Sequence, residues 1–245
     1  MSAPDLTIVI PAFNEERRLP GTLQRLGAFC NDLKITWEVL VIVEKSEDRT
    51  LDLAKQATTR QANFRVIAPG VHRGKGFAVR QGMLAARGEL ILFMDADLSV
   101  PLEEVPVFFE YQTAHPEVDV LVGSRKHAQS RIIKRQKWLR QRMGEAFNWI
   151  IRRVAGIRIR DTQCGFKAFR RPAAQAIFSR QQIDGFAFDV ETLLLADRLG
   201  FRVAELPVQW INSPDSKVRI VSDSLAMLRD AIRVRRLVNR KSNAT

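Results

Sequence analysis

Short apolar runs that alternate with helical patterns restrict this chain to one class of fold. Apolar runs of strand length occupy residues 6–10, 37–43, 64–67, 90–94 and 118–122, and helical patterns lie at about 15–33, 50–60 and 76–86. Strands that alternate with helices form mostly parallel sheets with helices on both faces. The sequence therefore predicts an α/β fold with a doubly wound sheet, whose strand ends gather at one edge.

The second half of the chain is less regular, but nothing in it marks a domain boundary. Residues near 135–155 and 223–239 combine apolar positions at helical spacing with several arginines, which predicts two basic amphipathic helices. We find no internal repeat, low-complexity tract or linker. Since 245 residues can enclose one large core, we expect a single domain over residues 1–245.

The sequence carries no signal for membrane insertion or for a disulfide framework. Its longest apolar runs have the length of strands, and the N-terminal residues lack the apolar segment of a signal peptide. Cys30 and Cys164 are its only cysteines. We therefore expect a cytoplasmic protein with free thiols.

Positive charge is concentrated in one part of the chain. The net charge is +12, and residues 125–160 hold twelve Lys or Arg residues and a single acid, Glu145, so that this window alone carries +11. Such a block favours an anionic partner: a phosphate, a nucleic acid or an acidic membrane surface. The patterns typical of single-strand or helix-turn-helix nucleic-acid binding are absent, so we expect no nucleic acid.

Asp95-Ala96-Asp97 directly follows the apolar run 90–94, which places two carboxylates at the carboxyl end of a buried strand. Ligands of open α/β sheets bind at that edge. Two neighbouring carboxylates suit a divalent cation that also holds the phosphates of a substrate, so the motif indicates a nucleotide-sugar site. The alternative is structural, because Asp97 or Ser99 can cap a helix that starts near Pro101.

Three loops at the same edge permit both a binding and a structural interpretation. Residues 11–16 either hold a nucleotide or open a helix with Asn14 as its N-cap, and residues 43–50 either bind a base or ribose or form a capped helix start. Residues 73–76, Arg-Gly-Lys-Gly, can approach an anion, but their spacing matches no established phosphate loop. We favour the structural interpretation for the last two loops.

Further polar residues follow the fifth predicted strand. Arg125 can form a forked pair either with a phosphate or with a neighbouring acid. Residues 161–167 read as a compact polar turn, and carboxylates at positions 161, 189 and 191 either orient an acceptor or complete a polar network.

Taken together, these segments resemble the inverting GT-A glycosyltransferases, in particular the polyprenyl-phosphate (dolichyl-phosphate) glucosyltransferase and mannosyltransferase group. The resemblance covers roughly residues 6–220 and is closest to the dolichyl-phosphate glucosyltransferase branch. It implies a GT-A domain with a Rossmann-like sheet. The segments that carry it, in the order of the family, are 8–16, 73–76, 95–97, 123–125, 161–167 and 188–191.

The resemblance also implies roles for individual residues. Asp95 and Asp97 would be catalytic and would hold Mg²⁺ or Mn²⁺ on the donor diphosphate. Arg125 would be catalytic too, facing the acceptor phosphate or the leaving group. The remaining candidates for substrate binding are Pro11, Phe13 and Glu15 in the nucleotide pocket, together with Glu44, Lys75, Gln163 and Lys217.

Two features depart from the family pattern. The second strand is followed by Glu44-Lys45-Ser46-Glu47 where the family has Asp-Asp-Gly-Ser, so Glu44 would replace the first aspartate. The contacts to base and ribose, and with them the choice of nucleotide, stay open. The chain also lacks the terminal membrane span that several relatives carry.

The implied reaction moves a hexose, with glucose favoured and mannose as the alternative, from a UDP-sugar or GDP-sugar to a polyprenyl phosphate with inversion. We expect the protein to act at the cytoplasmic face of a membrane, docked on anionic lipid through its basic helices, with Trp138, Trp149 and Leu237 inserted. The structural interpretation of the same helices is that their apolar stripes pack on the core and their basic faces are solvated. The first alternative is a GT-A enzyme with a soluble sugar or glycan acceptor. The second is a non-catalytic binder of anionic surfaces or nucleic acid.

Overall fold

The computed structural model describes residues 3–134, 148–150, 152–153, 156–212, 229–230 and 232–233. The expected helix near 223–239, most of the one near 135–155, and Trp138, Lys217 and Leu237 therefore lie outside the described residues. Of the first helix, residues 148–150 and 152–153 are described and are helical.

A seven-stranded sheet forms the centre of the protein, with the strand order β3-β2-β1-β4-β7-β5-β8. Six strands run in the same direction, and β7 runs antiparallel between β4 and β5. The strands are β1 (Leu6–Ala12), β2 (Trp37–Val43), β3 (Phe64–Ile67), β4 (Leu90–Met94), β5 (Val120–Ser124), β7 (Phe166–Arg170) and β8 (Val203–Pro207). The mostly parallel α/β fold expected from the sequence is confirmed.

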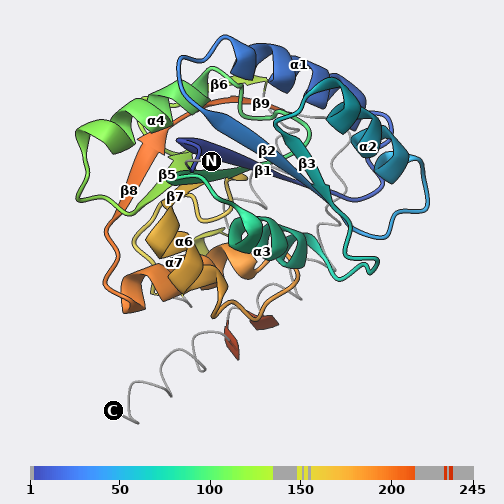
Figure 1. Ribbon diagram of the computed structural model, residues 1–245. Helices are drawn as coiled ribbons and strands as arrows, with labels where there is room; N and C mark the ends of the chain where they lie inside the picture. The colour runs from blue at the N-terminus through green and yellow to red at the C-terminus, as the bar shows by residue number, and fades with distance from the viewer. Residues whose placement is uncertain are drawn as a thin grey trace.

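Helices cover both faces of this sheet, as Figure 1 shows. One face carries α1 (Leu19–Asn31), α2 (Thr50–Arg60) and α4 (Glu104–Ala114), and the other carries α3 (Lys75–Ala85), α6 (Arg171–Phe178) and α7 (Phe188–Arg198). Alternate residues of each strand point to opposite faces and create two apolar cores: Ile8 and Leu92 lie in the first, Val9 and Phe93 in the second. Apolar strands buried on both sides thus explain the architecture.

A small second sheet pairs β6 (Arg131–Lys134) with β9 (Gln209–Ile211). Arg131 N donates to Val208 O (3.2 Å) in the connection from β8 to β9, and Ile211 N donates to Ser99 O (2.8 Å) in the segment after β4. The segment after β5 is thereby held beside the carboxyl end of β4.

One expectation about the second half needs correction. Phe166 and Lys167 belong to β7, not to a turn, because both pair with β4 and Lys167 also pairs with β5. The sheet is consequently mixed at this point. Since β4 and β5 both run antiparallel to β7, their carboxyl ends still meet at one edge, as expected.

Candidate active site

Asp95 and Asp97 lie in a tight turn at the carboxyl end of β4. Leu98 N donates to Asp95 O (3.3 Å), and Leu98 has a φ of +50°, which is rare for leucine and typical of constrained sites. Ala96 and Leu98 are buried, whereas both aspartates are partly exposed. The alternation of buried and exposed positions turns the two carboxylates toward the edge where ligands bind.

The helix-cap alternative for this motif is wrong. The helix α4 begins only at Glu104 and has no side-chain cap, while Asp97 Oδ1 accepts a hydrogen bond from Ser99 N (3.0 Å) within its own turn. Asp97 also lies 3.9 Å from the guanidinium of Arg18.

Gly165 forms a floor against Asp95. Asp95 N donates to Gly165 O (3.2 Å), and a Cβ atom added to Gly165 would lie only 2.0 Å from Asp95 Oδ2. The position of the Asp95 carboxylate therefore requires glycine here. The residues 161–165 thus help to build the site through their backbone.

Lys75 brings a positive charge to the same carboxylate from the N-terminus of α3. Its Nζ lies 2.5 Å from Asp95 Oδ1. Burial lowers the pKa of Lys75, but the charges of Asp95, Asp189 and Asp97 outweigh it and raise the pKa overall. Lys75 is therefore a protonated cation at neutral pH.

The glycines that flank Lys75 serve chain packing. An added Cβ at Gly76 would lie 2.5 Å from Ile183 O and 2.6 Å from Phe188 Cβ, and one at Gly74 would lie 2.7 Å from Asp184 O. Both glycines thus let the start of α3 approach residues 183–188, which supports the structural interpretation of this loop.

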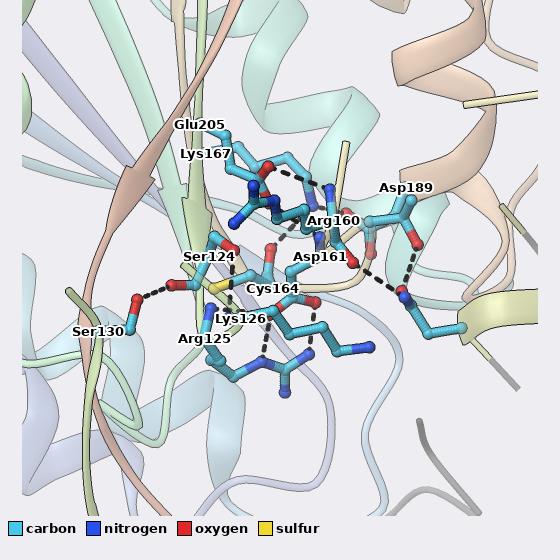
Figure 2. Close-up of polar contacts among 12 residues, drawn as sticks. Ser124, Arg125, Lys126, Ser130, Arg160, Asp161, Cys164, Lys167, Asp189 and Glu205 are labelled. Atoms are coloured by element: carbon cyan, nitrogen blue, oxygen red, sulfur yellow. Dashed lines mark hydrogen bonds and ion pairs between the residues drawn. The ribbon is translucent and has the colours of Figure 1, made fainter. Parts of the chain in front are cut away.

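Arg125 and Asp161 form a forked ion pair, which Figure 2 shows. The Arg125 Nε and Nη2 atoms donate to the two Asp161 oxygens at 2.7 and 2.8 Å, and Arg125 N donates to Oδ2 at 3.0 Å. Glu205 supports the pair from β8 by accepting from Arg160 N and Asp161 N. Of the two alternatives for Arg125, pairing with a neighbouring acid is confirmed.

This pair sets the charge of both residues. Burial would raise the pKa of Asp161, but the charge and hydrogen bonds of Arg125 and the charge of Lys126 lower it to about 2. Burial likewise lowers the pKa of Arg125, and the charge of Asp161 more than reverses this effect. About a third of the Arg125 side chain stays exposed (30%), and its guanidinium also lies over the Trp210 ring, 5.6 Å from the centroid.

We expect the Asp161→Asn variant to lose stability in a pH-dependent manner. Because the folded pKa of Asp161 lies below its ordinary value of 3.8, the charged form stabilises the fold above pH 4, and this contribution disappears as the pH falls toward 2. The variant should be about 2 kcal/mol less stable at pH 5. Urea unfolding should show that the difference shrinks by about 1 kcal/mol at pH 3. A difference that does not change with pH would contradict the assignment.

Hydrogen bonds join the loops after β1 and β2. Asn14 N donates to Ser46 Oγ (3.1 Å), Glu47 N donates to Asn14 Oδ1 (2.9 Å), and Glu15 N donates to Thr50 Oγ1 (2.7 Å). Asn14 has a φ of +53°, and α1 begins only at Leu19. The expectation that Asn14 caps a helix starting at Glu15 is wrong, because its side chain bridges to the neighbouring loop.

Glu44 lies inside the fold, 2% exposed, and holds the loop before α3. Its carboxylate accepts from Arg73 N (2.9 Å) and Gly74 N (3.0 Å) and contacts His72 Nδ1 (2.8 Å). The expectation that Glu44 binds substrate is thus not supported by its contacts, which assign it a structural task. The His72 ring in turn stacks on Phe13, with 3.7 Å between the centroids.

The other expected substrate-binding residues lie at the same edge with different surroundings. Pro11 is partly exposed in β1, and Gln163 is partly exposed in the turn before β7. Glu15 is nearly buried and forms a forked pair with Arg18 at 2.6 and 2.7 Å. The structure therefore gathers Asp95, Asp97, Lys75, Arg125 and Gln163 around the carboxyl edge.

The carboxylates of α7 complete a polar network, one of the two alternatives for them. Glu191 accepts from Gln182 N (2.9 Å) and Ile183 N (2.8 Å), and Asp189 pairs with Lys167. Burial raises the pKa of both acids, and nearby donors and cations partly oppose it. Neither acid is therefore available as an exposed acceptor ligand.

The chemistry of Asp95 and Asp97 fits a divalent cation that is shared with a substrate. Among the described residues, no three His, Cys, Asp or Glu side chains come together as a metal site. Mg²⁺ is typically held by one or two carboxylates together with the phosphates of its substrate. The Asp95 side chain is 38% exposed, so a diphosphate can reach it.

Sequence reasoning missed His72, Gly165 and Glu205. His72 sits in a loop without any motif of its own, and Glu205 lies in a strand far from the other site residues along the chain. Gly165 carries a usable signal: a glycine within a polar turn indicates a close approach of backbone and side chain.

No helix in the described part of the chain is long and apolar enough to cross a bilayer.

Comparison with known proteins places this geometry in a family. The model of the family described as "Glycosyl transferase family 2" matches residues 7–178. The chain belongs to this family. It is a glycosyltransferase of the GT-A fold, as the resemblance implied.

Similar proteins include several dolichyl-phosphate beta-glucosyltransferases. The protein of that name from Dictyostelium discoideum is 33% identical over 240 residues, which cover 94% of this chain and 73% of the relative. The human protein is 32% identical over 241 residues, covering 94% and 74%. These matches confirm the expected branch of the family.

Solved structures support the same fold at lower identity. Glucosyl-3-phosphoglycerate synthase from Mycobacterium tuberculosis in complex with UDP has a TM-score of 0.66 and 20% identity, covering 96% of this chain and 80% of the other. The complex of that enzyme with Mn²⁺, UDP-glucose and phosphoglyceric acid has a TM-score of 0.67 and 19% identity, covering 96% and 79%. At this identity, the likeness establishes the fold.

Proposed function

We propose that this glycosyltransferase moves glucose from UDP-glucose to a polyprenyl phosphate of the dolichyl type, with inversion, at a membrane surface. The observation that carries the proposal is the pair of outward-facing carboxylates at the carboxyl end of β4, with Lys75 beside Asp95 and Arg18 near Asp97. The names of the relatives supply the acceptor class and the sugar.

Asp95 and Asp97 would hold Mg²⁺ or Mn²⁺ against the donor diphosphate. The cation would stabilise the negative charge that develops on the leaving diphosphate. Lys75, a protonated cation beside Asp95, would add positive charge at the same place. Catalysis would thus rest on fixed charges that need no rearrangement during the reaction.

The acceptor phosphate is an anion that must approach a second anion, the donor. Arg125 would reduce their repulsion, because its Asp161 pair fixes the guanidinium while part of the side chain stays exposed. A phosphate monoester is largely ionised near neutral pH, so it can attack the anomeric carbon without a dedicated base. In-line positioning of the two substrates would then supply much of the rate enhancement.

The nucleotide base would bind beside Phe13 and His72. A stacked pair of rings at the end of β1 offers a flat surface, and stacking on an aromatic ring stabilises a base by about 1–3 kcal/mol. Glu44 fixes the His72 ring through Nδ1 and thus contributes indirectly.

Transfer assays test the proposal directly. The protein is incubated with radiolabelled UDP-glucose or GDP-mannose, with Mg²⁺ or Mn²⁺, and with dolichyl phosphate or phosphoglyceric acid as acceptor. We expect glucosylated dolichyl phosphate when UDP-glucose is the donor and no glycosylated lipid when GDP-mannose is the donor. Transfer to phosphoglyceric acid without lipid would favour the alternative of a soluble acceptor, and folded protein that transfers no sugar from either donor would overturn the proposal.

Exposed apolar and basic side chains support docking on a membrane. Trp149 is 64% exposed beside Ile150, and Ile133 of β6 is exposed close to Ile211 of β9. These side chains belong to or adjoin the basic window 125–160, which would attract anionic lipid with roughly 1 kcal/mol for each engaged Lys or Arg. Because Arg125 packs on Trp210 of β9, the part of this surface formed by Ile133 and Ile211 lies beside the proposed acceptor site.

We expect Trp149→Ala to weaken binding to anionic vesicles about tenfold, because a large exposed aromatic ring would leave the interface. Sedimentation with phosphatidylserine vesicles, at low and high salt, measures the effect. Val107→Ala, which removes an exposed apolar side chain on α4, is the matched control and should bind as the wild type does. If Trp149→Ala and Val107→Ala bound anionic vesicles equally well, this docking surface would be contradicted. It would also be contradicted if the wild-type protein bound neutral vesicles as tightly as anionic ones.

A further inference from the structure

Lys167 is a charged side chain in the interior of the protein. It is 0% exposed, and its Nζ lies 2.5 Å from Asp189 Oδ1, 2.8 Å from Cys164 O and 5.4 Å from the centroid of the Phe93 ring. Figure 2 shows Lys167, Asp189 and Cys164 close to the Arg125–Asp161 pair. Its three contacts belong to the turn before β7, the strand β4 and the helix α7.

Stability alone is a poor explanation for this pair. Removing two charges from water is costly, and apolar side chains of similar volume often replace a buried ion pair without loss of stability. The surroundings are apolar, since Phe93 contacts Phe188 with 5.7 Å between the ring centroids. An apolar pair could therefore fill this space. We look for the role of the two charges in the neighbouring candidate active site around Asp95.

The first connection from Lys167 to the site runs through the backbone. Lys167 Nζ fixes the Cys164 carbonyl, and the next residue, Gly165, accepts from Asp95 N and lies against the Asp95 carboxylate. A change in the direction of the Cys164 carbonyl would rotate the peptide that joins it to Gly165. The floor beneath Asp95 would then move with it.

The second connection runs through charge. Asp189 and Asp95 both act on Lys75, whose pKa they raise. Lys167 neutralises Asp189, so that Lys75 stays paired with Asp95 at 2.5 Å. Without Lys167, Asp189 would compete with Asp95 for the Lys75 ammonium group.

We propose that Lys167 and Asp189 form a positioning pair, which fixes the Asp95 carboxylate in the orientation that binds a divalent cation. The pair fixes Asp95 in two ways: it holds the Cys164–Gly165 peptide against which Asp95 packs, and it keeps Lys75 paired with Asp95. This inference rests on the proposed role of Asp95 as a metal ligand. Neither Lys167 nor Asp189 touches the substrate.

The double variant Lys167→Met with Asp189→Leu separates positioning from packing, because it removes both charges and keeps the space filled. We expect it to unfold at about the same urea concentration as the wild type. Its dissociation constant for Mn²⁺ in the presence of UDP, measured by electron paramagnetic resonance, should rise at least about tenfold, as is typical when a group behind a metal ligand is lost. Unchanged Mn²⁺ affinity would overturn the proposal.

Two further variants keep the result interpretable. Asp189→Asn retains the shape of the side chain and should also weaken Mn²⁺ binding, which provides the test if the double variant does not fold. Glu38→Gln removes a buried acid that pairs with Arg87 at the opposite edge of the sheet; it should lower stability and leave Mn²⁺ affinity unchanged. Equal Mn²⁺ affinity in Asp189→Asn and wild type would count against the pair.

Mn²⁺ binding is measured without sugar or lipid, so the outcome does not depend on the acceptor. A wild-type protein that binds Mn²⁺ and UDP but transfers no glucose would contradict the proposed function and leave the positioning role intact. If the wild-type protein transferred glucose and the double variant kept its Mn²⁺ affinity, the positioning role would be contradicted and the proposed function would stand.

Discussion

Replacing Asp95 and Asp97 together by asparagine should lower kcat/KM for glucose transfer by at least about a thousandfold. Asparagine keeps the size of each side chain but removes the negative charge that holds a divalent cation. Loss of a cation that stabilises the leaving diphosphate removes several kcal/mol of transition-state stabilisation, which corresponds to a factor of this size. Steady-state assays with UDP-glucose and dolichyl phosphate measure it.

Asp52→Asn is the matched control for this experiment. Asp52 is an exposed aspartate in the first turn of α2 and has no part in the proposed site, so its variant should keep wild-type activity. Thermal unfolding checks that the double variant is folded. Activity within tenfold of the wild type in a folded double variant would remove Asp95 and Asp97 from the mechanism.

Gly165→Ala should lower activity about a hundredfold through a single methyl group. The added Cβ would lie 2.0 Å from Asp95 Oδ2, so either the Asp95 carboxylate or the turn before β7 must move. A displacement of about 1 Å at a catalytic group is enough for a loss of this size. We also expect the crowding to cost roughly 1–3 kcal/mol of stability, which urea unfolding measures.

Gly185→Ala is a suitable comparison, because a Cβ at Gly185 meets nothing within 4 Å. It should leave both activity and stability close to those of the wild type. If Gly165→Ala lost only stability and kept its kcat and its metal dependence, the close packing of Gly165 on Asp95 would have no part in catalysis.

The strands of the first half were predictable because burial on both faces demands continuous apolar runs. Residues 37–43 are apolar at six of seven positions and coincide with β2 (Trp37–Val43). The Asp95–Asp97 motif was equally legible, because it follows such a run directly. Both predictions depend on local sequence alone.

The strand β7 could not be predicted from the local sequence in this way. Its sequence, Phe-Lys-Ala-Phe-Arg, carries two cations, and charged residues rarely occupy the centre of a sheet. Lys167 is buried there only because Asp189 lies against it, 22 residues later in the chain. A partner at such a distance cannot be inferred from one sequence.

The direction of the Glu44 side chain shows a second limit. The sequence places an acid after β2, where a contact with a ligand is plausible. It does not reveal that the backbone N–H groups of residues 73 and 74 donate hydrogen bonds to the Glu44 carboxylate. Asn14 is a similar case, because its bridge to Glu47 competes with helix capping. Loop contacts across the sheet edge decided both outcomes.

The forked pair of Arg125 and Asp161 has a consequence for how relatives can diverge. The chain leaves the main sheet at Arg125 and returns to it just after Asp161, and the pair joins these two points. Inside this segment, β6 pairs with β9 and Arg160 N donates to Glu205 of β8, so the segment is anchored at further points along its length. We therefore expect substitutions at exposed positions in the described parts of residues 126–160 to change the proposed acceptor side, while Asp95, Asp97 and Lys75 keep the proposed donor side unchanged.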